Sequence, residues 1–184
     1  NQCWFAENCR YLPSVSPSNS VSTTQPHYYV YNYFGTAVNA AMATSNYNTY
    51  GVLYNWPAIM STTEELCPNG WDIPTDSAWN QLTSFLGPST AGIQMKTASG
   101  WNSWPGNYGT NSSGFTGLPG GVNQNGWYGI GNHALWWSSS LCTSEPYSYG
   151  VNYASDVIQV NCGTNSQGYS ARCVTNQVVV AGCT

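Results

Sequence analysis

The sequence has very few charged residues. Asp, Glu, Lys and Arg make up 5% of its 184 residues, against about a quarter in ordinary soluble domains. Only Arg10, Lys96 and Arg172 carry a fixed positive charge, and the formal net charge is -4. Nucleic-acid binding needs a basic stripe, which three scattered cations cannot supply. This class of function is therefore excluded.

Long hydrophobic runs are missing as well. The longest apolar run, near residues 178–181, is far shorter than the roughly 20 residues that a membrane-spanning helix needs. We therefore expect no insertion into a membrane.

Metal-binding and catalytic motifs are also absent. There is no C-x-x-C pair, and only two histidines are present to complete a zinc site. His27 and His133 have no acidic residue near them in sequence, and no Ser, His and Asp arrangement with a nucleophile elbow occurs. We expect no metal site, no cofactor and no enzymatic activity.

What the sequence does contain favours a folded, secreted domain. Hydrophobic residues make up 41% and aromatic residues 15%, which is enough to build a core, and the length suits a single domain over residues 1–184. The low charge and the cysteines favour disulfides in an oxidising, extracellular or cell-surface location. Because the number of cysteines is odd, one is free, joined to another chain, or paired outside this chain. The seven are Cys3, Cys9, Cys67, Cys142, Cys162, Cys173 and Cys183.

The first half of the chain predicts irregular coil and two helices. Residues 13–49 show no steady period and are expected to form aromatic-packed coil. A short helix is expected to start at Pro57 and end near Met60. The strongest helix signal is "PTDSAWNQLTSFLG", with Thr75 as cap and Gly87 as terminator. Its expected apolar stripe comprises Trp79, Leu82, Phe85 and Leu86.

The second half predicts loops followed by a small sheet. From residue 98 onward glycine and asparagine recur too often for a helix. Strand-like segments then follow at 134–140, 148–153, 156–161, 169–174 and 177–181, spaced as in an antiparallel meander. Residues 175–184 form a C-terminal tail. Helices first and strands last indicate the α+β class.

Several motifs, taken together, resemble a known family. "CWFAENCRYL", "YGVLYNWPAIM", "CPNGWDIPTDSAWNQLTSFLG", "SGFTGLPGG", "WWSSS" and "GYSARCV" occur in the order typical of the Fibrobacter succinogenes major paralogous domain. The similarity spans roughly residues 2 to 174. That family resembles the C-type-lectin-like group, which also holds formylglycine-generating enzymes and the variable proteins of diversity-generating retroelements. The resemblance implies two helices, a small twisted antiparallel sheet and long irregular loops.

The resemblance also implies a disulfide between Cys67 and Cys173, which often occur together in the family. A Cys142–Cys162 disulfide would cross-link neighbouring strands. The remaining cysteines, Cys3, Cys9 and Cys183, would then share one bond and leave one thiol over.

The enzymes and lectins of this fold group do not fit the sequence. Cys162 and Cys173 could stand for the cysteine pair of the formylglycine-generating enzymes, but the arginine-and-double-glycine signature is absent. Calcium-dependent lectins use a Glu-Pro-Asn or Gln-Pro-Asp triplet, whereas "SEPYS" has Tyr147 where an amide is required. We expect neither site.

The stretch around Trp136 and Trp137 predicts two roles. The tryptophans are expected to belong to the core, and the residues after them to a recognition surface. These two tryptophans match a core strand of the family and are expected to be buried. The residues after them alternate with small or apolar positions, which places many on the solvent side. The expected ligand-binding residues are Trp127, Tyr128, His133, Tyr147, Tyr149, Tyr153, Asp156, Asn161 and Asn165, and Ser155 and Gln159 belong to the same exposed set.

Two functions remain open at this stage. Tyr with Ser, Asn and Gly is the composition of adaptable recognition surfaces. It favours an extracellular domain that binds a protein or glycan on another surface through its C-terminal strands and the loop around Trp127 to His133. The same residues could instead form a plain solvated face. The alternative function is a structural subunit of a surface appendage that self-associates through the odd cysteine or the apolar tail.

Overall fold

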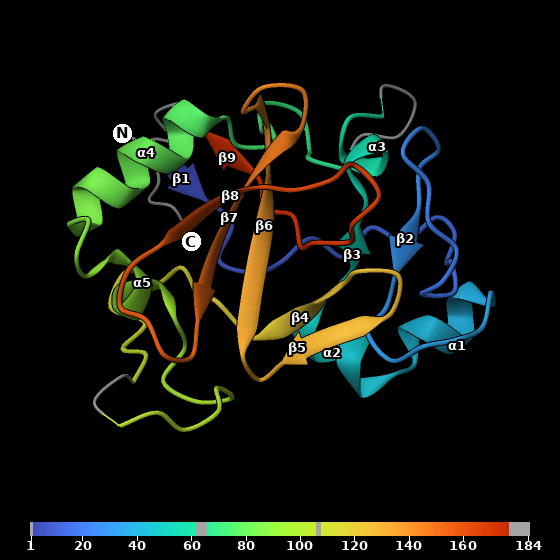
Figure 1. Cartoon of the computed structure of the whole chain (residues 1–184), viewed down its shortest axis with the longest axis horizontal. Coiled ribbons are helices and arrows are strands. Elements are labelled where there is room, and N and C mark those ends of the chain that lie inside the picture. The colour runs from blue at the N-terminus through green and yellow to red at the C-terminus, as the bar shows by residue number, and fades with distance from the viewer. Residues whose placement is uncertain (1, 62–65, 106–107, 177–184) are drawn as a thin grey trace.

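The computed structural model describes residues 2–61, 66–105 and 108–176. Five α-helices and nine β-strands lie in this part of the chain (Figure 1). The helices are α1 (Val38–Met42), α2 (Ser45–Tyr50), α3 (Trp56–Ile59), α4 (Asp76–Leu86) and α5 (Ala91–Met95). The strands are β1 (Cys3–Trp4), β2 (Tyr28–Tyr29), β3 (Leu53–Tyr54), β4 (Gly120–Asn123), β5 (Trp127–Ile130), β6 (His133–Leu141), β7 (Pro146–Asn152), β8 (Gln159–Cys162) and β9 (Val174–Thr175).

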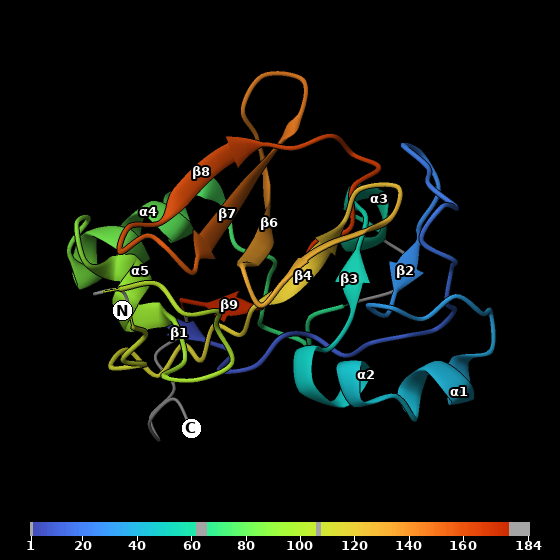
Figure 2. The same cartoon turned by 60° about the horizontal axis from the view of Figure 1, so that its bottom comes forward.

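A five-stranded sheet with the order β5-β4-β6-β7-β8 organises the fold. Strands β6, β7 and β8 form the expected antiparallel meander. β4 pairs antiparallel with β5 but runs parallel to β6 at Gly121 and Ala134, so the sheet is not wholly antiparallel. Figures 1 and 2 show α4 and α5 on one side of the sheet and α1, α2 and α3 on the other. The α+β class is confirmed.

Two hydrophobic clusters lie on opposite sides of β6. Trp136 belongs to the cluster with Trp79 and Phe115, and Trp137 to the cluster with Tyr54. Neighbouring strand residues point to opposite faces, so the tryptophan pair serves both clusters. Both rings are fully buried, which confirms the prediction.

Helix α4 begins and ends where its sequence signals predict. The Thr75 hydroxyl accepts a backbone N–H of the first turn at 3.2 Å, and Gly87 ends the helix with φ +86°. Trp79 is buried and Leu86 partly buried, but Phe85 is 86% exposed, so its place in the apolar stripe was wrong. Phe85 follows Trp79 by six residues, which is a rotation of about 240° around the helix axis and leads away from the buried face.

The expected coil over residues 13–49 is only partly observed. That segment contains β2, α1 and most of α2, and α5 follows α4 where no helix is expected. The five helices of the described residues thus exceed the two that the resemblance implies. Helices of five or six residues show little periodicity and depend on packing. Ala41 of α1 and Tyr47 of α2 are buried accordingly.

The strand predictions are best at β6 and β7. β8 is shorter than the predicted segment 156–161 and extends one residue past it, to Cys162. Of the segment 169–174 only Val174 lies in a strand, although Tyr169 exchanges backbone hydrogen bonds with Tyr54. Glycine-rich β4 was missed because its residues lack the β-branched and aromatic pattern of a strand. The segment 177–181 lies outside the described residues.

Both specific disulfide predictions are confirmed. Cys67 bonds to Cys173, 106 residues away, and Cys142 bonds to Cys162. Cys3 is also disulfide-bonded. Cys9 is free and buried, and Cys183 lies outside the described residues. Disulfides of this kind fit an extracellular scaffold.

Candidate functional site

The nine predicted binding residues fall into three places rather than one. The set around the β5–β6 turn is Trp127, Tyr128, His133 and Tyr153. The set beside α4 and α5 is Tyr147, Tyr149 and Asp156. The set in and after β8 is Asn161 and Asn165.

The first place has an exposed aromatic stack. Tyr128 is 58% exposed, and its ring lies 5.7 Å from the His133 ring at an interplanar angle of 21°. Burial lowers the pKa of His133, so its imidazole is neutral at pH 7. One face of the Tyr128 ring is therefore supported by an uncharged ring, while much of the residue remains open to solvent.

Amide side chains continue this surface. Asn102 donates from Nδ2 to Asn132 Oδ1 at 2.8 Å, and its backbone N–H donates to Gly131 O at 2.8 Å. Gly131 has φ +79°, and a Cβ there would lie 3.0 to 3.2 Å from the Asn102 side chain. Glycine thus permits both the turn and the close approach of Asn102.

A second aromatic pair completes the surface. Tyr153 donates its backbone N–H to Asn132 O at 2.9 Å, and its ring meets Trp104 edge to face at 5.7 Å. Trp104 is 47% exposed. We call the set of Asn102, Trp104, Tyr128, Asn132, His133 and Tyr153 the amide–aromatic surface.

Buried Lys96 supports this surface from within. Its Nζ donates to Asn152 O at 3.2 Å and to Ser155 O at 2.9 Å, on both sides of Tyr153. Burial lowers the pKa of Lys96, and Asp156 opposes that shift. Asp156 therefore favours the charged form of Lys96. The backbone carbonyl of Asp156 accepts a hydrogen bond from the N–H of Ile93 on α5.

Tyr149 does not lie on the solvent side, and this prediction was wrong. It is 1% exposed, stacks on Trp79 at 5.0 Å and donates its hydroxyl proton to Asp76. Tyr147 points to the same side of β7 and is partly buried. Val151, two residues after Tyr149, was the signal that this strand face is apolar.

The other predicted residues do not join the amide–aromatic surface. Trp127 is partly buried and contacts Tyr31 at 5.2 Å and exposed Phe34 at 6.3 Å. Asn161 is exposed on β8 at the far edge of the sheet. Asn165 accepts the backbone N–H of Trp56 through its own carbonyl.

Sequence reasoning missed two members of the surface, Asn102 and Trp104, whereas Asn132 lies in the predicted binding loop around Trp127 to His133. The segment 98–108, "ASGWNSWPGNY", carries the same mixture of aromatic, amide and small residues that marked the later strands. This composition was enough to indicate a recognition surface, but the segment was predicted only to be a loop.

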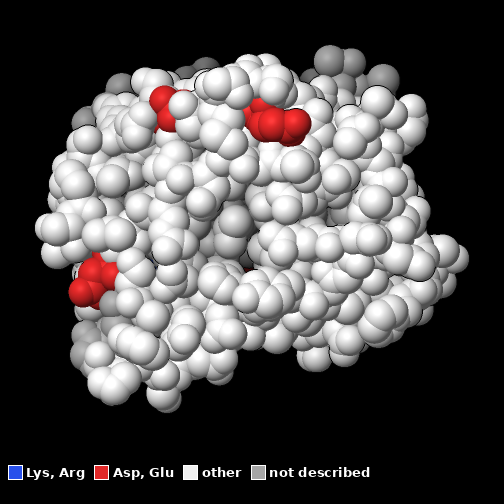
Figure 3. All heavy atoms as spheres, in the orientation of Figure 1, with Lys and Arg blue, Asp and Glu red and all other residues white. Residues whose placement is uncertain are grey.

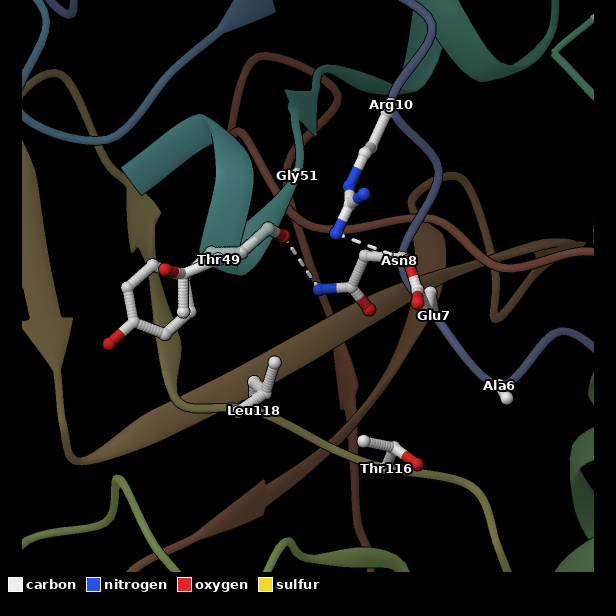
Figure 4. A pocket seen from close by; sticks show the side chains of 9 residues that line it. Ala6, Glu7, Asn8, Arg10, Thr49, Gly51, Thr116 and Leu118 are labelled. Atoms are coloured by element: carbon white, nitrogen blue, oxygen red, sulfur yellow. Dashed lines mark hydrogen bonds and ion pairs between the residues drawn. The ribbon is translucent and has the colours of Figure 1, made fainter. Parts of the chain in front are cut away.

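The structure also shows a hollow near the N-terminal segment (Figure 4). Its lining residues include Glu7, Asn8, Arg10, Thr49 and Leu118, and its volume is about 100 Å³. This is small beside the roughly 300–1,000 Å³ of small-molecule pockets. Asn8 uses both ends of its amide for internal hydrogen bonds, to Tyr50 O and from Trp136 Nε1 among others. The hollow therefore offers little free hydrogen-bonding capacity.

The outer surface of the molecule as a whole carries few charged side chains. Of the three Lys and Arg residues, Lys96 and Arg172 are about 1% exposed, and Arg10 forms an ion pair with Glu7 at 3.1 Å. Figure 3 shows a face that is almost wholly uncharged, with scattered acidic side chains and a hollow over β6. Ligand capture by such a surface depends on contact rather than on electrostatic steering.

Neither a metal cluster nor a membrane helix is found in the described part of the chain. No group of three or more His, Cys, Asp or Glu side chains there could hold a metal ion. None of the helices there combines the length and apolar character that crossing a bilayer requires.

Comparison with known proteins identifies a family for the chain. No curated protein and no solved structure matches the chain. The sequence pattern described as the Fibrobacter succinogenes major domain matches residues 1–175. The match covers nearly all of the chain, including every described helix and strand. The protein therefore belongs to the Fibrobacter succinogenes major domain family.

Proposed function

We propose that the protein is an extracellular recognition domain that binds an uncharged glycan non-covalently at the amide–aromatic surface. The observation that carries this proposal is the continuity of that surface. Contacts run from the Tyr128–His133 stack through Asn132 and Asn102 to the Trp104–Tyr153 pair. The segments that contribute these residues are far apart in sequence but are held together by hydrogen bonds.

The chemistry of the surface suits a neutral sugar. The face of an aromatic ring carries partial negative charge and attracts the weakly positive C–H bonds of a pyranose. Tyr128 and Trp104 offer such rings. Asn102 and Asn132 supply amide groups beside them, and amides both donate to and accept from hydroxyls. The surrounding lack of charge favours an uncharged ligand over an acidic one.

Loss of either exposed ring is expected to weaken binding. We expect Tyr128→Ala and Trp104→Ala each to lower affinity for a neutral oligosaccharide at least about tenfold, the effect of losing an aromatic anchor. Glycan arrays followed by titration calorimetry measure this. Phe85→Ala is the matched control, because Phe85 is an 86% exposed aromatic on α4, outside the surface.

The manner of binding provides a second test. Because no charged side chain belongs to the surface, affinity is expected to stay within about twofold between 0.05 and 0.5 M salt, and to be unaffected by EDTA. Unchanged affinity in both ring variants would rule out the site. Binding to protein arrays alone would replace the glycan by a protein partner.

The proposal also includes the fold group and the more distant relatives of the protein. We propose a C-type-lectin-like fold and a relationship to retroelement variable proteins on the basis of the sequence resemblance. In such a protein, exposed Tyr128 and Trp104 are positions that tolerate variation. Tyr149 and Ser148 are buried in the sheet and are not.

The structural-subunit alternative is supported by one observation. β8 lies at the edge of the five-stranded sheet, and all four of its residues are exposed, including Val160 at 50%. An exposed edge strand is a template for pairing with another chain. Light scattering over a concentration series separates the functions: a monomer throughout supports recognition, and growth with concentration supports assembly.

A further inference from the structure

Three cysteines meet at one point of the fold. Cys67 and Cys173 form a disulfide, and the free thiol of Cys9 lies 3.6 Å from Cys173 Sγ. Cys9 and Cys173 are buried, whereas Cys67 is partly exposed next to exposed Pro68. We call Cys9, Cys67 and Cys173 the cysteine triad. Cys173 Sγ is thus bonded to one sulfur, that of Cys67, and in contact with a second, that of Cys9.

The backbone holds both neighbours of Cys173 in place. Cys9 donates its N–H to Ala171 O at 2.9 Å, so the segment carrying Cys9 lies along the segment carrying Cys173. On the other side, Asp72 and Val174 exchange two backbone hydrogen bonds of 2.9 Å. These bonds do not involve any sulfur. Either cysteine can therefore be bonded to Cys173 without loss of the surrounding pairing.

We propose that the cysteine triad undergoes internal disulfide exchange, which makes Cys67 a site for reversible covalent attachment of thiol-reactive or disulfide-bearing molecules. The Cys9 thiolate attacks Cys173 Sγ, so that a Cys9–Cys173 bond forms while the Cys67–Cys173 bond breaks. The electron pair leaves on Cys67 Sγ, which takes up the proton that Cys9 lost. The step is redox-neutral and needs no outside oxidant or reductant.

The exchange converts a hidden thiol into a reachable one. Before it, the free thiol is buried Cys9; after it, the free thiol is partly exposed Cys67. A disulfide-bearing molecule such as oxidised glutathione then reacts with the Cys67 thiolate to give a mixed disulfide and release one thiol. This inference is independent of the proposed glycan site, because none of the three cysteines belongs to the amide–aromatic surface.

The protonation state of Cys9 sets the rate. Burial raises the pKa of Cys9 to about 12, and the nearby Arg172 guanidinium opposes that rise. Tyr54 also faces Cys9, and its own pKa is raised by burial and by Cys9. The thiolate is the attacking species, and its fraction grows about tenfold per pH unit below the pKa. Exchange is therefore slow at pH 7 and faster in alkali.

Thiol mapping tests the exchange in the full-length oxidised protein. With N-ethylmaleimide at pH 9, we expect alkylation of Cys67, about 100-fold faster than at pH 7, together with a Cys9–Cys173 linked peptide in a peptic digest. Cys9→Ser is the matched control, since it removes the attacking thiol and leaves the Cys67–Cys173 bond in place. Its digest is expected to show no alkylated Cys67.

The Cys67→Ser variant tests independently whether Cys9 can bond to Cys173. Refolded in a glutathione buffer, it is expected to contain the Cys9–Cys173 disulfide and no free thiol in the triad. Because both sulfurs are buried, the variant is unfolded in denaturant with N-ethylmaleimide present, and alkylation of both Cys9 and Cys173 there would overturn the proposal. Should this variant fail to fold, the wild-type labelling decides alone: label on Cys9, or no label on Cys67 at pH 9, contradicts the exchange.

Discussion

Asn8→Ala is expected to destabilise the protein by about 3–5 kcal/mol, a loss large enough to leave a marginal domain mostly unfolded at 37 °C. Asn8 is only 9% exposed, and its side chain connects the N-terminal segment to three distant parts of the chain. Chemical denaturation followed by tryptophan fluorescence measures the change.

The size of the effect follows from the partners of the Asn8 side chain. Its Oδ1 accepts hydrogen bonds from Trp136 Nε1 at 2.9 Å and from Arg172 Nε at 3.1 Å. Its Nδ2 donates to Tyr50 O at 2.9 Å and to Ser170 Oγ at 3.2 Å. Truncation leaves these polar groups without a partner in the interior, which costs their desolvation.

Arg172 makes the loss larger than that of an ordinary hydrogen-bond network. Its guanidinium is buried 4.0 Å from the Phe115 ring, and it donates to the carbonyls of Phe5, Phe115 and Thr116. Burial lowers its pKa to about 9, with Cys9 and Glu7 opposing. Arg172 keeps these three carbonyl acceptors when Asn8 is truncated, but a hydrogen bond to a buried charged group contributes more to stability than one between neutral groups.

The neighbouring Glu7 is the matched control for this prediction. It lies in the same segment but is 69% exposed in its ion pair with Arg10, so Glu7→Ala is expected to change stability by less than about 1 kcal/mol. Equal destabilisation by Glu7→Ala and Asn8→Ala would show that the segment matters as a whole and that the Asn8 network does not.

Removing every disulfide at Cys173 is expected to have the other large effect. The double variant Cys9→Ser/Cys67→Ser should lose about 5 kcal/mol, since the native bond closes a loop of 106 residues. Cys67→Ser alone should lose much less, because Cys9 bonds to Cys173 in its place and closes an even longer loop. Urea midpoints of the two variants give the comparison.

The second disulfide provides the scale for that comparison. Cys142 and Cys162 are 20 residues apart, so the variant Cys142→Ser/Cys162→Ser is expected to lose only about 3 kcal/mol. If Cys67→Ser proves as unstable as the double variant at Cys9 and Cys67, then Cys9 does not replace Cys67.

Local signals predicted the parts of the fold that depend on local chemistry. Thr75 and Gly87 set the bounds of α4 because a cap and a left-handed terminator act within one helical turn. Trp136 and Trp137 were expected to be buried because the family resemblance placed them in a core strand, and both rings are buried. Tyr147 and Tyr149 lie on one face of β7, as the alternation of a strand requires.

Alternation alone does not tell which face of a strand another element covers. Tyr149 was expected on the solvent side, yet α4 brings Trp79 over it. The same limit applies to Asn8, whose hydrogen-bond partners lie 42 to 164 residues away. No local pattern in the sequence indicates that a polar residue with such distant partners is buried.

The candidate surface was predicted in part for the same reason. Tyr128, His133 and Tyr153 were identified from composition, because aromatic and amide residues stand out in a charge-poor sequence. Asn102 joins them through its hydrogen bonds to Gly131 and Asn132, and Trp104 joins them through its ring contact with Tyr153. These contacts between a loop and a strand turn depend on tertiary structure, which composition does not contain.

The most direct test of the proposed recognition function is residue-resolved chemical-shift mapping. The ¹⁵N-labelled protein is titrated with neutral oligosaccharides, and the backbone amides and the Trp104 indole are followed. Saturable shifts concentrated at Asn102, Trp104, Tyr128, Asn132 and Tyr153 are the predicted result. Shifts confined to β8 or to the neighbourhood of Asn165, or no saturable shift with any neutral oligosaccharide, would contradict it.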